Sequence, residues 1–183
     1  MMRALSIAAI LCMCWASPGL AMPDLWQALR SGAAVALMRH AEAPGTGDPA
    51  GFRLDDCTSQ RNLSAAGRAQ AARLGERFRS NGITAAEIRS SAWCRCRDTA
   101  SALGLGPEQV AAPLNSFFGA PGSAGDSTAG LRELIAGLSA GQPAVLVTHQ
   151  VNITALTGIY PRSGEVVVIR RGDLAVLGRI APD

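Results

Sequence analysis

The sequence has no lysine, two histidines and few aromatic residues, which make up 4% of the chain. All 17 side chains of the lysine and arginine type are therefore arginines. Genome composition can produce such a bias, but arginine is also the side chain that binds phosphate with two parallel N–H donors. The net charge of +3 is too small to predict binding to nucleic acid or to an anionic membrane surface.

The chain also lacks an apolar run of about 20 residues, the length needed to span a membrane. Residues 1–21 instead have the three parts of a secretory signal peptide: Arg3, an apolar segment from Ala4 to Trp15, and small residues at 17–21. We therefore expect an exported, periplasmic protein without a stable membrane anchor. The remaining residues, 22–183, are enough for one hydrophobic core and too few for two full domains.

Outside the predicted signal peptide the cysteines are Cys57, Cys94 and Cys96. In an oxidising compartment the simplest arrangement is one disulfide and one free thiol. Cys57 would pair with either Cys94 or Cys96, and the sequence does not choose between them. A Cys-x-Cys metal site competes with the disulfide, but it has no histidine close by in sequence.

Helix and strand patterns alternate along most of the chain, without an internal repeat, and predict a layered α/β fold with helices on both faces of a sheet. The expected helices cover residues 24–30, 64–80, 91–100, 131–138 and 151–156, and the expected strands cover residues 35–40, 87–90, 110–112, 144–149, 165–170 and 174–180. Two long loops, residues 42–62 and 114–128, complete the pattern. Loops of this length in a compact domain are usually functional or disordered.

Each of the two histidines ends a buried strand pattern: His40 follows Arg39, and His149 follows residues 144–148. Ligands of open α/β sheets bind beyond the carboxyl ends of the strands. Arg95 lies where a helix begins after another strand, which is a good location for binding an anion. An imidazole is nucleophilic near neutral pH, and arginines clamp phosphoryl oxygens. These residues predict phosphoryl transfer onto histidine, with no metal and no cofactor.

Four segments of the chain resemble, in the same order, the signatures of the histidine phosphatase superfamily, which contains the phosphoglycerate mutases and acid phosphatases. They are residues 37–42 (Leu-Met-Arg-His-Ala-Glu), similar to an Arg-His-Gly opening; residues 62–71, similar to Leu-Ser-x-x-Gly-x-x-Gln-Ala; residues 91–100, similar to Ser-x-x-x-Arg-x-x-x-Thr; and residues 147–149, which end in the second histidine. The resemblance implies a phosphoglycerate mutase-like, three-layer α/β/α fold with a mostly parallel sheet.

The resemblance also implies a role for each main residue of the site. His40 is the phosphorylated nucleophile, Arg39 and Arg95 hold the phosphoryl group, and His149 completes the pocket. Arg97 is the alternative to Arg95, but the spacing within the motif favours the earlier arginine.

Arg61 and Glu42 are candidates for contact with the substrate, although a solvated loop charge explains either residue equally well. The implied activity is that of a phosphoric monoester hydrolase acting on a small or envelope-linked phosphate ester. The exported setting is similar to that of the lipopolysaccharide core heptose phosphatases. The sequence does not specify the oligomeric state.

Two positions depart from the family pattern. Ala41 replaces the glycine after the first histidine, which is tolerable if that residue does not need a positive φ. The general acid that protonates the leaving group is not evident. The two positions where relatives carry it hold Asn115 or Ser116, and Gln150.

The missing acid leaves three interpretations open. Another carboxylate, such as Glu42, Asp126 or Glu133, reaches the site through a loop. Alternatively, the substrate has a good leaving group, such as a phosphohistidine or an anhydride, and needs less protonation. In the third interpretation the protein binds phosphorylated ligands without turnover. A metal site that combines the two histidines with a cysteine is a weaker alternative to all three.

Overall fold

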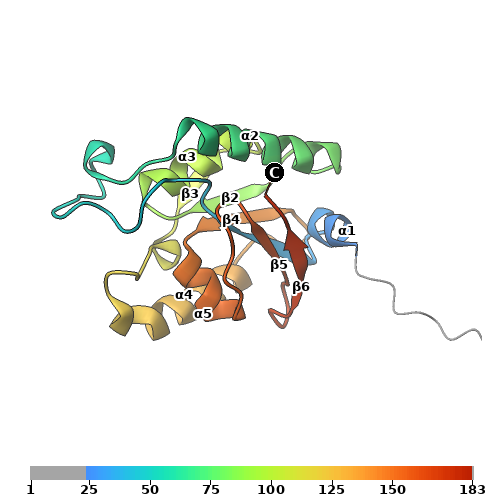
Figure 1. The fold of residues 1–183 in the computed structure, drawn as a ribbon. Helices are drawn as coiled ribbons and strands as arrows, with labels where there is room; N and C mark the ends of the chain where they lie inside the picture. The colour runs from blue at the N-terminus through green and yellow to red at the C-terminus, as the bar shows by residue number, and fades with distance from the viewer. Residues whose placement is uncertain (1–23, 183) are drawn as a thin grey trace, which may run out of the picture.

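The computed structural model describes residues 24–182 and has a six-stranded sheet between two layers of helices (Figure 1). The strands are β1 (Ala34–Arg39), β2 (Glu87–Ser90), β3 (Glu108–Val110), β4 (Ala144–Thr148), β5 (Val166–Arg170) and β6 (Val176–Ile180). The helices are α1 (Leu25–Arg30), α2 (Ala65–Ser80), α3 (Cys94–Leu103), α4 (Ala124–Ala136) and α5 (Gln150–Thr157), with 3₁₀ turns η1 (Cys57–Ser59), η2 (Ala112–Leu114) and η3 (Pro121–Ser123). The predicted three-layer α/β/α fold is confirmed.

The predicted signal peptide, residues 1–21, lies outside the described residues, so export remains a prediction. Within the described part of the chain, no helix is both long enough and apolar enough to cross a membrane.

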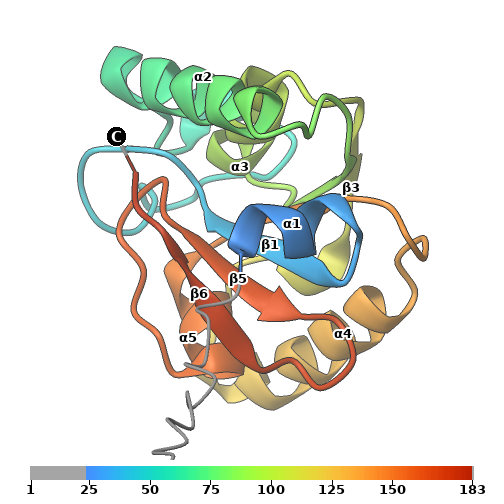
Figure 2. The same ribbon diagram turned by 90° about the vertical axis from the view of Figure 1, so that its right-hand side faces the viewer.

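The sheet has the strand order β3-β2-β4-β1-β5-β6. The first four strands of this order are parallel, whereas β5 and β6 run antiparallel to their neighbours. Helices α2 and α3 cover one face, and α4 and α5 cover the other (Figure 2). Because the helix after β1 and the helix after β4 lie on opposite faces, the carboxyl ends of these neighbouring strands form the crevice where α/β sheets bind ligands.

The apolar side chains of β1 pack into two hydrophobic cores, one on each face of the sheet. Ala34, Ala36 and Met38 pack with the α2 and α3 layer, and Val35 and Leu37 pack with the α4 and α5 layer; all five side chains are 0% exposed. Successive side chains of a strand point to opposite faces, so a strand covered on both sides needs a continuous apolar run. This requirement explains why the run can be recognised in the sequence.

The predicted strand at residues 110–112 forms two residues earlier, at β3. Pro113 enters η2 directly after it and ends the extended conformation. Since β3 is an edge strand with an exposed Val110, its sequence carries little apolar signal.

Helix α4 begins at Ala124, inside the segment predicted to be a loop. Ser123 precedes the helix without a capping hydrogen bond from its side chain. The first turns also hold Gly125 and Gly130, which are weak helix formers, so neither a cap nor a propensity signal marks the start.

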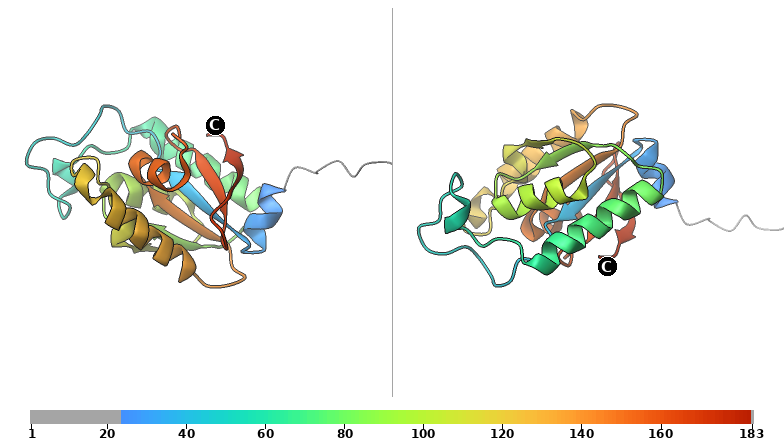
Figure 3. Two further views of the ribbon diagram at one scale, coloured as in Figure 1. Left: turned by 90° about the horizontal axis from the view of Figure 1, so that it is seen from below. Right: turned by 90° about the horizontal axis from the view of Figure 1, so that it is seen from above.

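The segment after β1, residues 42–62, projects from the end of the sheet away from α1 (Figure 3). A disulfide between Cys57 and Cys94 ties it to the start of α3, and Cys96 is free and buried. The pairing that the sequence left open is therefore Cys57 with Cys94. The segment is long but anchored, and it passes over the carboxyl ends of β1 and β4.

Candidate active site

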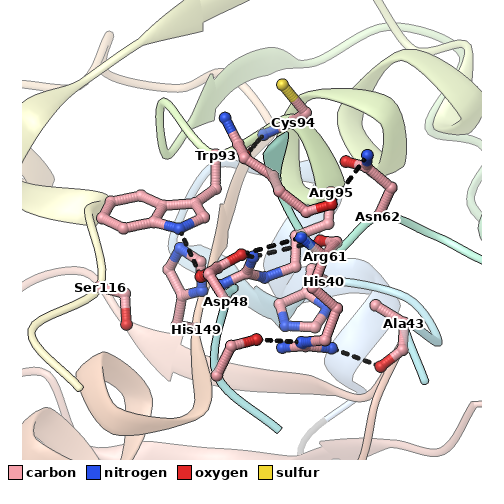
Figure 4. A network of polar contacts seen from close by, with 12 residues as sticks. His40, Ala43, Asp48, Arg61, Asn62, Trp93, Cys94, Arg95, Ser116 and His149 are labelled. Carbon is pink, nitrogen blue, oxygen red and sulfur yellow. Dashed lines mark hydrogen bonds and ion pairs between the residues drawn. The ribbon is translucent and has the colours of Figure 1, made fainter. Parts of the chain in front are cut away.

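The two histidines meet at the carboxyl ends of β1 and β4. The backbone N–H of His40 donates to the carbonyl of Thr148 at 2.9 Å, and the imidazole rings of His40 and His149 have centroids 5.5 Å apart. Both residues are buried, at 2% and 4% exposure. Figure 4 shows His40 and His149 gathered with Arg95, Arg61 and Asp48.

The hydrogen bonding of His40 leaves one ring nitrogen available. Nδ1 lies 2.7 Å from the carbonyl oxygen of Ala41, which can only accept, so Nδ1 carries the proton and Nε2 keeps its lone pair. Burial lowers the pKa of His40 to about 3, and the charges of Arg95 and Arg39 act in the same direction. The imidazole is therefore neutral at physiological pH, the form in which it is a nucleophile.

His149 is held by the turn that follows β2. Its Nε2 lies 2.8 Å from the hydroxyl of Ser91 and 3.5 Å from the thiol of Cys96. Burial lowers the pKa of His149 well below its ordinary value, and the neighbouring His40 and Arg95 lower it further. A neutral ring in this position can donate its N–H to an oxyanion, but it adds no charge.

Three arginines line the cavity above the histidines, and each is fixed by backbone carbonyls. Arg39 donates to the carbonyl of Pro161 at 3.0 Å, and Arg61 donates to those of Gly47, at 2.7 Å, and Ala43. Burial lowers the pKa of Arg39 and of Arg61, and the nearby Arg95 lowers both further. Crowded cations of this kind are stabilised by an anion.

Two of these arginines keep an N–H without an acceptor. The Nε atoms of Arg39 and Arg95 are buried and have no hydrogen-bond partner among residues 24–182. A buried donor that is left unpaired costs about 1–3 kcal/mol.

Asp48 is a residue of the cavity that the sequence analysis missed. Its carboxylate accepts from Arg95 Nη1 at 2.8 Å and Nη2 at 3.2 Å, from the Arg61 backbone N–H at 3.0 Å, and from Trp93 Nε1 at 3.0 Å (Figure 4). The side chain of Asp48 is only 8% exposed. Burial raises the pKa of Asp48, but these hydrogen bonds and the Arg95 charge outweigh it, so the pKa lies below its ordinary value.

A cavity of about 580 Å³ opens above the histidines. Its walls combine the polar groups described above with a rim of aromatic side chains: Phe52, Trp93, Phe118 and Tyr160. Phe118 and Tyr160 are 58% and 67% exposed. The volume is in the range of small-molecule sites.

Glu42 does not line this cavity. Its carboxylate accepts from the hydroxyl of Ser64, the N-cap of α2, at 2.9 Å, and its backbone N–H donates to Gln70 at 3.0 Å. Gly67 packs against the Glu42 backbone. The second motif of the sequence therefore holds the chain where it leaves β1, and Glu42 belongs to that support.

The third motif supports the backbone beside His40 in a similar way. Thr99 accepts from the backbone N–H of Ala41 at 3.0 Å and donates to the carbonyl of Arg95 at 2.7 Å. Ala41 has no positive φ, so the alanine that replaces the family glycine is accommodated. Arg97 points away from the site, with its side chain 49% exposed and bound to Glu108.

The positions at which relatives carry an acid hold other groups here. Asn115 accepts from the backbone N–H of Ala92 at 2.8 Å, Ser116 lines the cavity, and Gln150 donates to Thr154 at 2.8 Å. Asp126 and Glu133, which the sequence analysis considered, are exposed residues of α4 outside the cavity lining. Among residues 24–182, Asp48 is the single carboxylate that lines the cavity.

Within the described residues, no three His, Cys, Asp or Glu side chains lie close enough together to hold a metal ion. Of the two cysteines considered as ligands, Cys94 is consumed by the disulfide and Cys96 contacts His149.

Arginine side chains around a neutral imidazole are chemically suited to hold the oxygens of a phosphoryl group. The model of the histidine phosphatase superfamily (branch 1) matches residues 35–114, which include three of the four motifs. This part of the chain is thus similar to the histidine phosphatase superfamily.

Solved structures agree with this fold at low sequence identity. SixA from Agrobacterium tumefaciens is 20% identical, with a TM-score of 0.58 over 83% of this chain and 99% of its own. The protein histidine phosphatase SixA in complex with tungstate is 16% identical, with a TM-score of 0.57 over 81% and 96%. A mycobacterial glucosyl-3-phosphoglycerate phosphatase is 20% identical, with a TM-score of 0.54 over 74% and 89%. A search of curated proteins found no match.

Proposed function

We propose that this protein is an exported, metal-independent phosphatase that forms a phosphohistidine at His40 and hydrolyses a small or envelope-linked phosphomonoester. The observation that carries the proposal is the free Nε2 of a neutral His40 at a cavity that Arg39, Arg61 and Arg95 line. A nucleophile and donors for the equatorial oxygens are the two requirements of phosphoryl transfer.

The charges of the cavity support a phosphomonoester as substrate. Three arginines and one aspartate line it, an excess of two positive charges that matches a phosphomonoester dianion. In the proposed reaction His40 Nε2 attacks phosphorus, while Arg39, Arg95 and Arg61 hold the phosphoryl oxygens. Because the arginines are anchored beforehand, little reorganisation accompanies the transfer. His149 lies beside the same oxygens as a neutral hydrogen-bonding partner.

The aromatic rim favours a small leaving group with a ring. Phe52, Trp93, Phe118 and Tyr160 offer flat apolar surfaces for a sugar or an aromatic group. The predicted signal peptide and the Cys57–Cys94 disulfide favour the periplasm, where envelope glycans are the nearest phosphorylated sugars. These features support a substrate class like that of the lipopolysaccharide core heptose phosphatases.

A phosphohistidine substrate is the competing assignment, because structural neighbours of the chain are named for it. Turnover of a phosphorylated histidine protein, with no turnover of any sugar phosphate, would favour this assignment over a small ester.

A quenched intact-mass measurement with an aryl phosphate tests the proposed intermediate. We expect a mass increase of one phosphoryl group that is acid-labile and absent in His40→Ala. Arg95→Ala should also abolish the adduct. Arg97→Ala is the matched control, since this arginine lies two residues further along the same helix and faces Glu108, and it should form the adduct normally.

A phosphate-binding protein without turnover is the second candidate function. It is favoured by Asn115 and Gln150 at the positions where relatives carry an acid. Tight phosphate binding by a folded protein that forms no adduct and releases no product from a broad panel would establish it in place of the phosphatase.

A further inference from the structure

The leaving oxygen of a phosphomonoester needs a proton unless it belongs to a good leaving group. Asp48 lines the cavity that holds the nucleophile, whereas the other carboxylates considered for this role lie outside it. Asp48 is thus the one described carboxylate in contact with the space where an ester would bind.

The surroundings of Asp48 link it to the phosphoryl site. Both terminal nitrogens of Arg95 donate to its carboxylate, while Arg95 Nε remains buried without a partner. Trp93 Nε1 donates to Oδ2, the oxygen that makes the longer contact with Arg95. The Trp93 ring lines the same cavity. The carboxylate therefore lies between the phosphoryl clamp and the aromatic wall that would hold the leaving group.

We propose that Asp48 is the general acid that protonates the leaving oxygen, and that the substrates are consequently phosphate esters of alcohols or sugars. This inference rests on the proposed phosphatase function and names its substrate class. With Asp48 as the acid, the substrate does not need a good leaving group.

The proposed reaction has two steps, phosphorylation of His40 and hydrolysis of the phosphohistidine. His40 Nε2 forms a bond to phosphorus as the ester P–O bond breaks, and the carboxyl proton of Asp48 passes to the leaving oxygen to give an alcohol. Water then attacks the phosphohistidine, the P–N bond breaks, and Asp48 takes the proton of the attacking water. Inorganic phosphate leaves, and Asp48 then releases its proton to solvent or keeps it for the next ester.

The resting contacts with Arg95 keep Asp48 ionised, so substrate binding must supply the protonated form. A phosphomonoester that binds in the cavity beside Arg95 offsets the charge of that arginine and brings a dianion close to the carboxylate. A like charge within about 4–6 Å raises a carboxyl pKa. The proton comes from solvent or from the monoanionic form of the ester.

A comparison of leaving groups separates general-acid catalysis from the positioning of Arg95. The measurement is kcat/KM, which reports the phosphorylation step, for p-nitrophenyl phosphate and for a sugar phosphate. We expect Asp48→Asn to lower kcat/KM for the sugar phosphate by about 10²–10⁴-fold, the usual contribution of a general acid, and to lower that for the aryl ester far less. Asp48→Glu should restore part of the sugar phosphate activity.

Trp93→Phe is the control, because it removes one hydrogen bond to the carboxylate and keeps the acid itself. It should lower kcat/KM for the sugar phosphate far less than Asp48→Asn does. An equal loss on both substrates in Asp48→Asn would overturn the proposal and make Asp48 a positioning residue for Arg95. Unchanged or faster turnover with tighter phosphate binding would overturn it as well, with Asp48 then acting as a competing internal anion.

The phosphohistidine measurement distinguishes a failure of this inference from a failure of the proposed function. If wild-type protein forms the His40 adduct and Asp48→Asn shows no leaving-group dependence, only the role of Asp48 is wrong. If no adduct forms with either substrate and neither is hydrolysed, the proposed function fails and the inference falls with it.

Discussion

The backbone of Gly67 in α2 lies directly against the backbone carbonyl of Glu42, so that a Cβ at Gly67 would overlap the Glu42 oxygen. The contact joins the first turns of α2 to the chain two residues after the nucleophile. A backbone-to-backbone approach of this kind has no flexible side chain that can give way, which explains why the second motif contains a glycine here.

Gly67→Ala should lower the free energy of unfolding by about 1–3 kcal/mol, the usual cost of forcing extra atoms into a packed contact. It should also reduce phosphatase activity, since the shift is transmitted to the exit of β1. Urea unfolding and an aryl phosphate assay measure both effects.

Gly125→Ala is the matched control, because a Cβ at this helical glycine of α4 meets nothing within 4 Å. Alanine is favoured over glycine in a helix by about 0.5–1 kcal/mol, so this variant should be as stable as wild type or slightly more stable. Equal destabilisation of both variants would contradict the role given to the Gly67 contact.

Stability should fall between pH 6.5 and pH 4.5, before most carboxylates titrate. The folded-state pKa of His40 is about 3, below its ordinary value of 6.5, so the unfolded chain takes up the proton first as the pH falls. Each such histidine removes up to about 1.4 kcal/mol of stability per pH unit in this window. His149, whose pKa is lowered by burial, acts in the same direction.

Urea unfolding across this window checks the histidine effect. His40→Asn should have a shallower slope than wild type, and His40→Asn with His149→Asn should be nearly flat. The carboxylates with lowered pKa, such as Glu165, contribute stability that is lost only at lower pH, below their ordinary values. A double variant with the wild-type slope would assign the effect to other groups.

Reduction of the disulfide should destabilise the fold by about 4 kcal/mol, because Cys57 and Cys94 close a loop with a sequence separation of 37. Non-reducing peptide mapping should recover these two cysteines linked. Cys96 should resist alkylation in the native protein, since burial raises the pKa of its thiol to about 12. Rapid labelling of Cys96 without denaturant would contradict this environment.

The sequence predicts those helices and strands that are marked by neighbouring residues, such as an apolar run or a helix cap. The strand before His40 and the strand before His149 are continuous apolar runs because both of their faces are covered. Ser64 caps α2 as its sequence indicates. The start of α4 carries no such local signal, since neither a side-chain cap nor a strong helix former marks Ala124.

The residues of the candidate site also differ in whether local sequence predicts them. His40, His149 and Arg95 lie in motifs at strand and helix ends, so the sequence places them together. Asp48 lies in a loop without periodicity and meets Arg95 across 47 residues, a contact that tertiary structure alone creates. Glu42 is the opposite example. It lies close to His40 in sequence, but its carboxylate binds Ser64 and does not line the cavity.

Thr99→Val should reduce both stability and activity. The substitution keeps the shape of the buried side chain but leaves the backbone N–H of Ala41 without its acceptor, at a cost of about 1–3 kcal/mol. Ala41 also supplies the carbonyl that fixes the His40 tautomer, so a looser peptide at this position should lower kcat/KM.

Thr99→Ser tests whether the hydroxyl group itself is responsible for these effects. Serine keeps the acceptor for Ala41 and the donor to Arg95, and it loses only a methyl group. We therefore expect Thr99→Ser to keep most of the activity that Thr99→Val loses, with urea unfolding and kcat/KM as the two measurements. If both variants lose activity to the same extent, packing of the methyl group would be the cause, and the hydrogen bond between Thr99 and Ala41 would have no part in holding the nucleophile.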